Sequence, residues 1–450
     1  MAKPQDEEEA PPIELSARGA PTPREDNINM LTAKRSPAFI MVQKLLVDAL
    51  RRRAEQIMLD YTAQAVAVRY QVDGFWINTA ALDRPTGDAM LAVMKVISAL
   101  NMNERRAAQR GKFNAEYKKK KYDCHLTSQG VPTGERAMLK LEDPKETKPQ
   151  TADDLGMRES MVPQAKEMLA NESGIILIAS PPTHGFTITF NALLRSADRF
   201  TRNFVEIQDK AKAEKAVENV PIVPESTYDS RQNQTPQSIM ERLIRTYPDV
   251  LVTRDLVNGE LVNLLAAQAA DKRLVIAGGR GRDCIDALLR VLQLGCDTAK
   301  FAAQVKGVLC SRLLRTLCEK CKKPYPPPPQ VLMQLGIPPG KVAAFYAPHE
   351  GPLPVEDPKE EPRLCNKCQG IGFRGRAAIF ELLIPDDNFR QTLAKVPPLG
   401  STDPATLQRI QAALVAAARQ CKMRTIQEEG VVLVARGVTA LPELLRVLKE

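Results

Sequence analysis

Four short, largely apolar runs separated by helical stretches constrain the fold of this chain more than any other feature. The run Ile175–Ala179 contains only apolar residues, and further runs follow at Phe204–Ile207, Val250–Val252 and Leu274–Ala277. Such strands are typical of a parallel sheet that helices cover on both faces. We therefore predict an α/β fold with a parallel sheet for the central part of the chain.

The composition excludes several classes of protein. Of the chain's 450 residues, 44% are apolar and 26% are charged, which is the composition of an ordinary globular protein. This length corresponds to about three domains. No apolar run approaches the roughly 18 residues of a membrane helix, and the acidic, Pro-rich start does not resemble a signal peptide. We therefore expect a cytoplasmic protein. Its net charge of +9 permits acidic partners without requiring them.

Changes in composition divide the chain into segments. The first 35 residues are polar and rich in Pro and Glu, which predicts a disordered tail. A helix, alternating strands and a hairpin signal at Asp73–Gly74 follow. The predicted segments after the tail are an α+β domain (36–142), a linker (143–154), a core (155–395) that includes a cysteine-bearing subdomain (318–376), and a helical C-terminal region (396–450).

Two C-x-x-C pairs form the strongest local motif. Cys318 and Cys321 form the first pair, and Cys365 and Cys368 form the second. Two residues between cysteines allow a turn to aim both sulfurs at one ion, and four thiolates suit a closed tetrahedral zinc site. A closed site of this kind is structural, so we predict one structural Zn²⁺ that staples the long insertion. Gly370, Gly372 and Gly375 would permit the tight turns beside it.

The segment after the first apolar strand occupies the place of a phosphate-binding loop. It reads S-P-P-T-H-G-F-T from Ser180 to Thr187, whereas such loops read G-x-x-x-x-G-K-[ST]. Gly185 and Thr187 remain, but Phe186 stands in place of the lysine. Backbone N–H groups at the following helix could still bind an anion. The candidate nucleotide-binding residues are Ser180, Gly185, Phe186 and Thr187; a plain strand-to-helix connection is the alternative.

A basic stretch lies between Glu104 and Lys121 and contains interleaved aromatic residues. This pattern is compatible with a nucleic-acid patch. A solvated face that contacts protein is the favoured interpretation, because no RNA- or DNA-binding motif surrounds the stretch. We therefore expect no specific nucleic-acid partner.

Several blocks in one order resemble the secretion-motor ATPases of type II secretion and type IV pilus assembly. The resemblance begins near Pro37 and continues to the C-terminus. The blocks are Val68–Gly74, Asn103–Lys112, Gly134–Arg136, Gly174–Pro181, Arg312–Cys321, Cys368–Arg376 with Glu381, and Met423–Gly430.

This resemblance implies a RecA-like P-loop core behind the small α+β domain. It further implies a hexameric ring, formed by this chain with itself or with a competent paralogue, that acts on a platform protein of the inner membrane. The protein would then be cytoplasmic and peripheral at that membrane. Arg105, Arg106 and Arg136 match positions that would face a neighbouring subunit. We expect the additional N-terminal docking module of some relatives to be missing.

The chain departs from the resembling family where that family hydrolyses ATP. The acidic box I-E-D-P-V-E aligns with Ile207–Lys212 and retains only Asp209. The Walker B segment aligns with Tyr247–Asn258, where Asp255 replaces the catalytic Glu and Arg254 stands beside it where the family has Gly. The histidine of the next box is replaced by Arg280. Phosphoryl transfer needs positioned cations, a metal and an oriented water. We therefore predict weak or absent binding of ATP and Mg²⁺.

Three functions are compatible with the sequence. The favoured one is a family member with weakened or lost ATP hydrolysis that acts as a structural or regulatory subunit, with Asp209 and Asp255 as weak catalytic candidates. The second is an active ATPase in which Arg254 or Arg280 replaces the lysine. The third is a zinc-bearing protein that binds nucleic acid through the basic stretch.

Overall fold

The computed structural model describes residues 12–146, 148–212, 214–338, 340–353, 363–399 and 403–449. The chain divides into two compact units, which are described separately. The first comprises residues 1–147 and 350–371, and the second comprises residues 148–349 and 372–450. The division at residue 147 falls within the segment predicted as a linker. Residues 350–371 group with the first unit, whereas the sequence predicted them within the core.

The first unit is an antiparallel sheet with helices. Its strands are β1 (Ile13–Arg18), β2 (Ala54–Tyr61), β3 (Ala65–Val72), β4 (Phe75–Asn78), β5 (Leu82–Asp83), β6 (Gln109–Tyr117), β7 (Lys120–Val131) and β8 (Gly134–Glu142). Its helices are α1 (Pro23–Lys34), α2 (Ala38–Arg51) and α3 (Arg84–Ile97). The strand order is β1-β6-β7-β8-β2-β3-β4, with β5 paired to β3.

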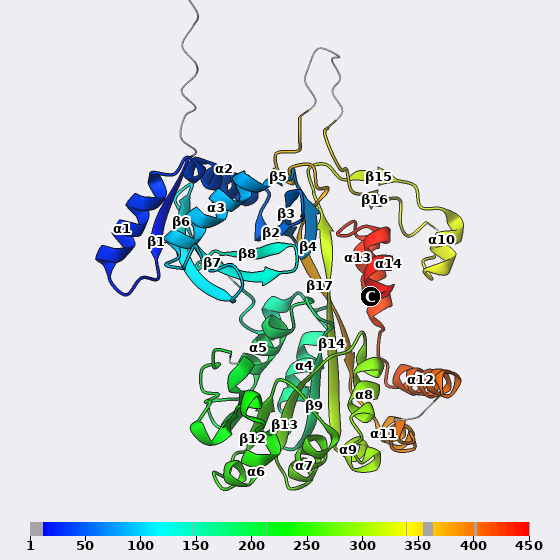
Figure 1. Ribbon diagram of the computed structural model, residues 1–450. Coiled ribbons are helices and arrows are strands. Elements are labelled where there is room, and N and C mark those ends of the chain that lie inside the picture. Colours follow the sequence, from blue (N-terminus) through cyan, green and yellow to red (C-terminus); the bar gives the residue numbers. More distant parts are fainter. Residues whose placement is uncertain are drawn as a thin grey trace, which may run out of the picture. The chain divides into compact units, whose positions relative to one another are not determined.

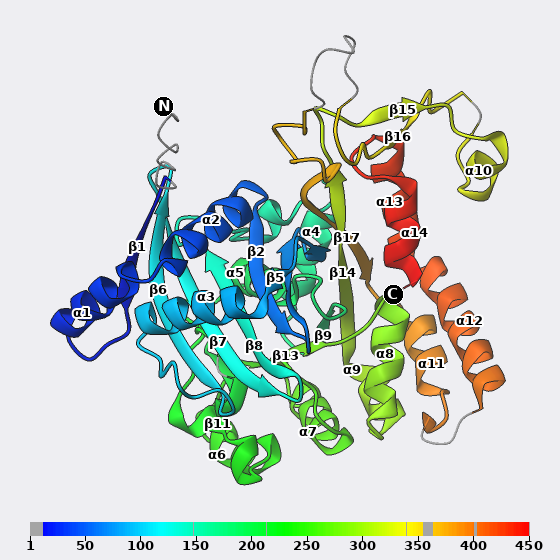
Figure 2. The same ribbon diagram turned by 45° about the horizontal axis from the view of Figure 1, so that its top comes forward.

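One face of this sheet lies in a hydrophobic core. Burial alternates along β3, where every second residue from Val66 to Val72 is buried. Val42 and Leu46 of α2 and Met94 of α3 belong to the same buried cluster. Figure 2 shows α2 and α3 lying across the strands. The predicted hairpin between β3 and β4 is confirmed, since Asp73 and Gly74 both have positive φ.

The prediction of a disordered tail is wrong for residues 12–35. β1 pairs with β6 and buries Ile13 and Leu15, so even a short alternation of apolar residues is enough to add an edge strand. α1 begins with a capping box in which Thr22 and Glu25 satisfy each other's backbone N–H groups. The overall polarity of the segment concealed these two local signals. Residues 1–11 of the predicted tail lie outside the described residues.

The second unit is built on a mostly parallel sheet. Its main strands are β9 (Gly174–Ala179), β10 (Phe204–Asp209), β11 (Thr227–Tyr228), β12 (Val250–Thr253), β13 (Leu274–Gly279), β14 (Val305–Leu317) and β17 (Phe373–Leu383). The order is β11-β10-β12-β13-β9-β14-β17, and every pair is parallel except β14 with β17. The predicted parallel sheet is therefore confirmed.

Helices cover both faces of this sheet. They are α4 (Met161–Leu169), α5 (Phe186–Ser196), α6 (Pro236–Ile244), α7 (Gly259–Ala270), α8 (Cys284–Gln293), α9 (Thr298–Gln304), α11 (Asp387–Ala394) and α12 (Pro404–Gln420). Ile176 and Ile178 of β9 pack into one core with α4 and α5. Ile175 and Leu177 pack into the opposite core with α6 to α9, α11 and α12. Alternate residues of one apolar strand thus contact two different helical layers.

The antiparallel pair β14 and β17 leads to a smaller region of the same unit. This region contains β15 (Lys323–Tyr325), α10 (Pro329–Gln334), β16 (Phe345–Ala347), α13 (Ile426–Ala435) and α14 (Leu441–Lys449). β15 pairs with β16, and Phe345 of β16 shares a buried cluster with Leu314 of β14 and Val434 of α13. Figure 1 shows β14 and β17 as long strands that reach toward β15 and β16.

Candidate nucleotide site and cysteine cluster

The predicted nucleotide-site residues lie at one edge of the parallel sheet. Ser180 directly follows β9, Asp209 ends β10, Arg254 follows β12 and Arg280 follows β13. The carboxyl ends of parallel strands meet at the same edge, where α/β proteins commonly bind ligands. The structure therefore brings together the boxes that the sequence placed far apart.

The loop between β9 and α5 is fixed by hydrogen bonds within the unit. Ser180 is buried, and its hydroxyl lies 3.3 Å from the His184 carbonyl oxygen. The backbone N–H of Leu313 on β14 donates to Nδ1 of His184 at 3.0 Å. Gly185 caps α5 with a φ of 80°, a conformation that favours glycine. The loop keeps the strand–loop–helix form expected of an anion-binding turn.

Phe186 is the first residue of α5, and its ring packs into the protein. The ring centroids of Phe186 and Phe190 are 5.3 Å apart, and Phe186 contacts the buried cluster between β9, α4 and α5. A side chain at Gly278 would collide with this ring, because a Cβ there would lie 2.6 Å from Cζ of Phe186. The position that carries a lysine in a phosphate-binding loop thus contributes to an apolar core.

Arg254 forms an ion pair inside the site. Its side chain is only 11% exposed, and Nε lies 2.5 Å from Oε1 of Glu206, whose side chain is fully buried. Nη2 of Arg254 lies 3.3 Å from the second Glu206 oxygen. The guanidinium also stacks over the Phe190 ring at 5.1 Å. These contacts hold the cation of Arg254 in a fixed orientation.

Glu214 contacts three residues of the altered boxes. Its carboxylate accepts a hydrogen bond from the Thr187 hydroxyl at 3.2 Å and lies 3.3 Å from Nη1 of Arg254. The side-chain amide of Gln208 donates to the Glu214 backbone carbonyl at 3.1 Å. A carboxylate of this protein therefore lies beside the loop that was predicted to bind phosphate.

The two candidate catalytic carboxylates are in different environments. Asp255 is half exposed, and its carboxylate lies 3.5 Å from Nζ of Lys212. Asp209 is buried and accepts backbone hydrogen bonds from Ala211 and Ser230. Burial raises the pKa of Asp209, but the hydrogen bonds from Ser230 and Ala211 outweigh it and hold this pKa below its usual value. Asp209 is therefore a charged carboxylate that Ser230 and Ala211 hold in place.

The four cysteines of the C-x-x-C pairs lie together at the end of the β14–β17 pair. Cys318 follows β14, and its N–H donates to the carbonyl of Gly372, the residue before β17. Leu317 pairs with Phe373, which places the end of β14 beside the start of β17. Gly370 and Gly372 have φ values of 79° and 80°, as the predicted tight turns require. Gly375 also has a positive φ, 83°, but it lies within β17, where the register with β14 shifts.

The geometry of this cluster fits a metal ion. Cys318, Cys321, Cys365 and Cys368 are all buried, and their sulfurs lie within 4.8 Å of one another. A tetrahedral ion with sulfur ligands at about 2.3 Å separates those sulfurs by about 3.8 Å. The predicted convergence of the two pairs is confirmed, and the four side chains could hold a metal.

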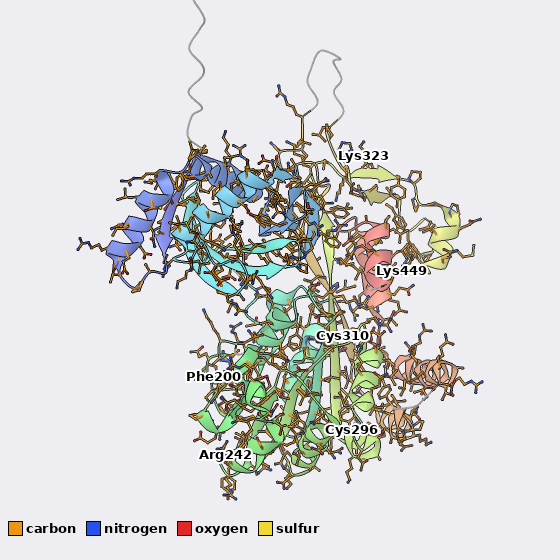
Figure 3. The ribbon with its side chains drawn as sticks, in the orientation of Figure 1. Phe200, Arg242, Cys296, Cys310, Lys323 and Lys449 are labelled. Atoms are coloured by element: carbon orange, nitrogen blue, oxygen red, sulfur yellow. The ribbon has the colours of Figure 1, made fainter. Side chains whose placement is uncertain are left out.

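The other five cysteines lie elsewhere. Cys124, Cys284 and Cys310 are buried, and Cys296 and Cys421 are partly buried. Figure 3 shows Cys296 and Cys310 away from Lys323, which lies two residues after the first cysteine pair. Burial raises the pKa of the Cys284 and Cys310 thiols. These side chains therefore act as small apolar groups of the core.

The three predicted interface arginines belong to the first unit. Arg105 and Arg106 line a cavity of about 380 Å³, and Arg105 lies 3.6 Å from Asp88. Arg136 makes two contacts with Asp60, at 3.0 and 3.1 Å, and is half exposed. Arg136 is not among the residues that line the cavity, so the structure groups only the first two arginines there.

Comparison with known proteins adds the family. The model of the family described as Type II/IV secretion system protein matches residues 32–446 of this chain. The chain belongs to this family. The resemblance deduced from the sequence blocks is thereby confirmed.

Individual relatives are distant in sequence. The Type IV pilus assembly ATPase PilB of Thermus thermophilus is 26% identical over 99% of this chain and 45% of its own length. Type II secretion system protein E of Pseudomonas aeruginosa is 24% identical over 97% of this chain and 80% of its own length. The chain thus spans about half the length of PilB.

A solved structure shows the same fold. The X-ray structure of the Legionella pneumophila ATPase DotB aligns with a TM-score of 0.55 at 12% identity. The alignment covers 91% of this chain and 95% of DotB. The mixed α/β architecture is therefore shared with an ATPase of known structure.

Sequence reasoning missed two residues that shape the candidate nucleotide site. Glu206 lies within a strand whose other predicted residues are apolar, and a lone carboxylate in a buried strand requires a partner. That signal pointed to a buried cation, and Arg254 is that cation. Glu214 lies in a charged segment without periodicity, so no pattern in the sequence singled it out.

Proposed function

We propose that this protein is a non-hydrolysing member of the type II/IV secretion family and serves as a structural or regulatory subunit of a secretion or pilus motor. Its second unit would be a RecA-like core whose nucleotide site no longer performs phosphoryl transfer. The proposal rests chiefly on the environment of Phe186, where a packed ring replaces the cation that would meet the phosphates.

The cation that does lie near the site is already paired. Arg254 is bound to the buried Glu206, so its charge is neutralised before any nucleotide arrives. Moving the guanidinium toward a phosphate would leave Glu206 buried and unpaired, which costs about 3–5 kcal/mol. This cost argues against Arg254 as a substitute for the missing lysine.

The candidate general base is also poorly placed for catalysis. Asp255 is one methylene shorter than Glu, is half exposed and lies beside Lys212. A general base must be held within hydrogen-bond reach of the attacking water, whereas this side chain faces solvent and pairs with an exposed lysine. Neither feature supports an oriented attacking water.

An active ATPase is the second candidate function, and one observation favours it. Arg280 directly follows β13, at the same edge of the sheet as the loop, and its side chain is exposed. It could therefore supply the missing cation to the nucleotide site of a neighbouring subunit. The experiment that separates the two functions is steady-state ATP hydrolysis by the purified full chain with Mg²⁺. We expect no turnover above that of the Asp255→Ala variant. Robust hydrolysis that Asp255→Ala abolishes would refute the proposed function.

The nucleic-acid function receives little support from the described basic stretch. Phe113 and Tyr117 are buried in the core of the first unit, and Tyr122 packs partly against it. Aromatic rings that stack on bases must be exposed. The stretch lacks such rings among its described aromatic residues.

We further propose that the four clustered cysteines bind one structural Zn²⁺. Their number, burial and thiol chemistry suit a closed site, which leaves no open position for a substrate. Zinc would then supply folding energy to the end of the β14–β17 pair, and it would take no part in a reaction.

The proposed partners are other copies of this chain or a competent paralogue in a ring, and a platform protein at the inner membrane. Arg105, Arg106 and Arg136 would contact the neighbouring subunit. The described residues contain no helix that is both long and apolar enough to cross a membrane. We propose a cytoplasmic location with peripheral attachment through the platform.

A further inference from the structure

We propose that Glu214 is a built-in anion that occupies the phosphate end of the degenerate nucleotide site and keeps nucleotides out. The inference rests on the proposed function and deepens it, because it gives this site an internal occupant. It concerns binding, whereas the proposed function concerns hydrolysis.

The contacts of Glu214 match those that a bound phosphate would make. One carboxylate oxygen accepts from the Thr187 hydroxyl at 3.2 Å, and the other lies 3.3 Å from Nη1 of Arg254. A hydroxyl and a guanidinium are groups that bind phosphate oxygens in proteins. A hydroxyl donor on α5 and the guanidinium that follows β12 thus both contact a single carboxylate.

Two substitutions in the motifs support the same contact. Gln208 replaces an acid of the family pattern, and its amide donates to the Glu214 carbonyl at 3.1 Å. A glutamate carboxylate at this position is an acceptor only, so it could not make this bond. Arg254 replaces a glycine of the family pattern and supplies the cationic partner of Glu214. Both changes therefore favour the position of Glu214 that the structure shows.

Electrostatics also favour the internal anion over a nucleotide. Arg254 is shared between Glu206 and Glu214, so one positive charge already faces two carboxylates. A phosphate that enters beside them would add like charge to an anionic pair. Glu214 is covalently attached, so its effective concentration at the site is in the millimolar range. A nucleotide must displace it, and the apparent affinity falls by the fraction of molecules whose site is closed.

Removal of the carboxylate should therefore open the site. The test titrates the full-length protein with fluorescently labelled ADP in the presence of Mg²⁺, for the wild type and three variants. We expect Glu214→Ala to bind about tenfold to a hundredfold more tightly than the wild type. Glu214→Gln keeps the shape of the side chain and removes its charge, so it should give an intermediate gain.

Glu218→Ala is the matched control. Glu218 follows Glu214 by four residues, is 77% exposed and lies 3.9 Å from Arg199. The Glu218→Ala variant loses one negative charge but keeps the contacts of Thr187 and Arg254. Its affinity for the labelled ADP should therefore equal that of the wild type. Thermal unfolding checks that Glu214→Ala and Glu214→Gln are folded. If both are folded and bind labelled ADP no more tightly than Glu218→Ala, the inference is wrong. That outcome leaves the proposed function intact, whereas ATP turnover by the wild type would refute the proposed function by itself.

Discussion

The guanidinium of Arg254 forms a two-point ion pair with the buried carboxylate of Glu206, with Nε and Oε1 2.5 Å apart. Arg254 directly follows β12, and Glu206 lies in the adjacent parallel strand β10, whose register with β12 places Glu206 opposite Val252. From the sequence alone, Arg254 is an additional charge without an evident partner beside an altered Walker B segment. The structure instead makes it one half of a buried pair that stabilises this edge of the sheet.

The first prediction is that Glu206→Gln destabilises the second unit. The substitution removes the buried carboxylate that faces the Arg254 guanidinium and leaves only the partly exposed Glu214 beside it. Loss of one member of a buried pair costs about 3–5 kcal/mol. Lys212→Gln is the control, because it breaks the exposed pair with Asp255, and such pairs contribute about 0–1 kcal/mol. Urea unfolding followed by circular dichroism measures both. Equal losses for the two variants would contradict a special role for the Arg254–Glu206 pair.

The second prediction concerns the metal. Protein purified without chelator should contain close to one zinc per chain by elemental analysis. Cys365→Ser combined with Cys368→Ser should lose the metal, because two thiolates cannot complete a closed tetrahedral site. Cys296→Ser should keep it, since Cys296 is partly buried outside the cluster. Native protein without zinc would refute the proposed site.

The sequence predicts the parts of this fold that repeat a simple physical pattern. The run Ile175–Ala179 predicts β9 because a strand that is apolar on both faces must be buried on both faces. The C-x-x-C pairs predict a cluster because four thiolates at that spacing have few other uses. The segment after β9 predicts α5 because Gly185 and the following residues form a strand-to-helix turn.

The rest depends on contacts between residues that are far apart in the chain. β1 escaped prediction because Ile13 and Leu15 become a strand only when β6 offers a pairing edge. The role of Arg254 depends on Glu206, 48 positions away. Glu214 is positioned by Gln208, Thr187 and Arg254, and no local pattern contains that information.

The third prediction concerns assembly. If Arg105 and Arg106 contact a neighbouring subunit, light scattering of the wild type should show species larger than 49.7 kDa. The double variant Arg105→Ala with Arg106→Ala should shift the distribution toward the monomer. Arg18→Ala is a control in the same unit, because Arg18 is an exposed arginine whose ion pair with Asp123 is long, at 3.9 Å. A wild type that stays monomeric at high concentration, alone and mixed with a competent paralogue, would argue against the interface.

The fourth prediction is a pH dependence that Glu381 causes. Its carboxylate is buried on β17 and accepts backbone hydrogen bonds from Cys284 at 2.8 Å and Ile426 at 2.7 Å, at the starts of α8 and α13. Burial, with a contribution from Asp283, raises the pKa of Glu381 to about 7. The folded protein therefore binds a proton more tightly than the unfolded chain.

This difference in pKa sets the direction in which the free energy of unfolding changes with pH. Between pH of about 4.5 and 7 the folded state holds a proton that the unfolded state has lost, so stability falls as pH rises through that range. The free energy of unfolding of the wild type minus that of Glu381→Gln should fall by up to about 3 kcal/mol between pH 4.5 and 7.5.

Glu443→Gln is the control for this pH dependence. Burial raises the pKa of Glu443, but hydrogen bonds from Arg446 and Arg315 outweigh it and lower this pKa to about 2. Its stabilising effect is therefore present above the unfolded pKa of about 4.3 and is lost only as pH falls below it. The Glu443→Gln difference should stay nearly constant from pH 5 to 7.5. A Glu381→Gln difference that is equally flat would show that Glu381 does not titrate in this range.

The fifth prediction is that Phe186→Lys improves nucleotide binding without restoring turnover. A lysine at the start of α5 supplies a cation where phosphates would meet the loop, and a charge-assisted contact of this kind adds about 1.5–3 kcal/mol. The gain corresponds to roughly tenfold to a hundredfold in affinity. Ile188→Lys is the control, because it adds the same charge at an exposed position of the same helix. Its affinity should stay near that of the wild type.

Hydrolysis should nevertheless stay absent in Phe186→Lys, because the lysine, the Walker B acid and the acidic box act as a unit in catalysis. Asp255 would still lie in solvent beside Lys212, and Gln208 would still hold the Glu214 backbone. The loss of the Phe186–Phe190 contact should also lower stability by about 1 kcal/mol, which thermal unfolding detects. Measurable steady-state turnover by Phe186→Lys would mean that the remaining groups are competent and that position 186 alone silences the site.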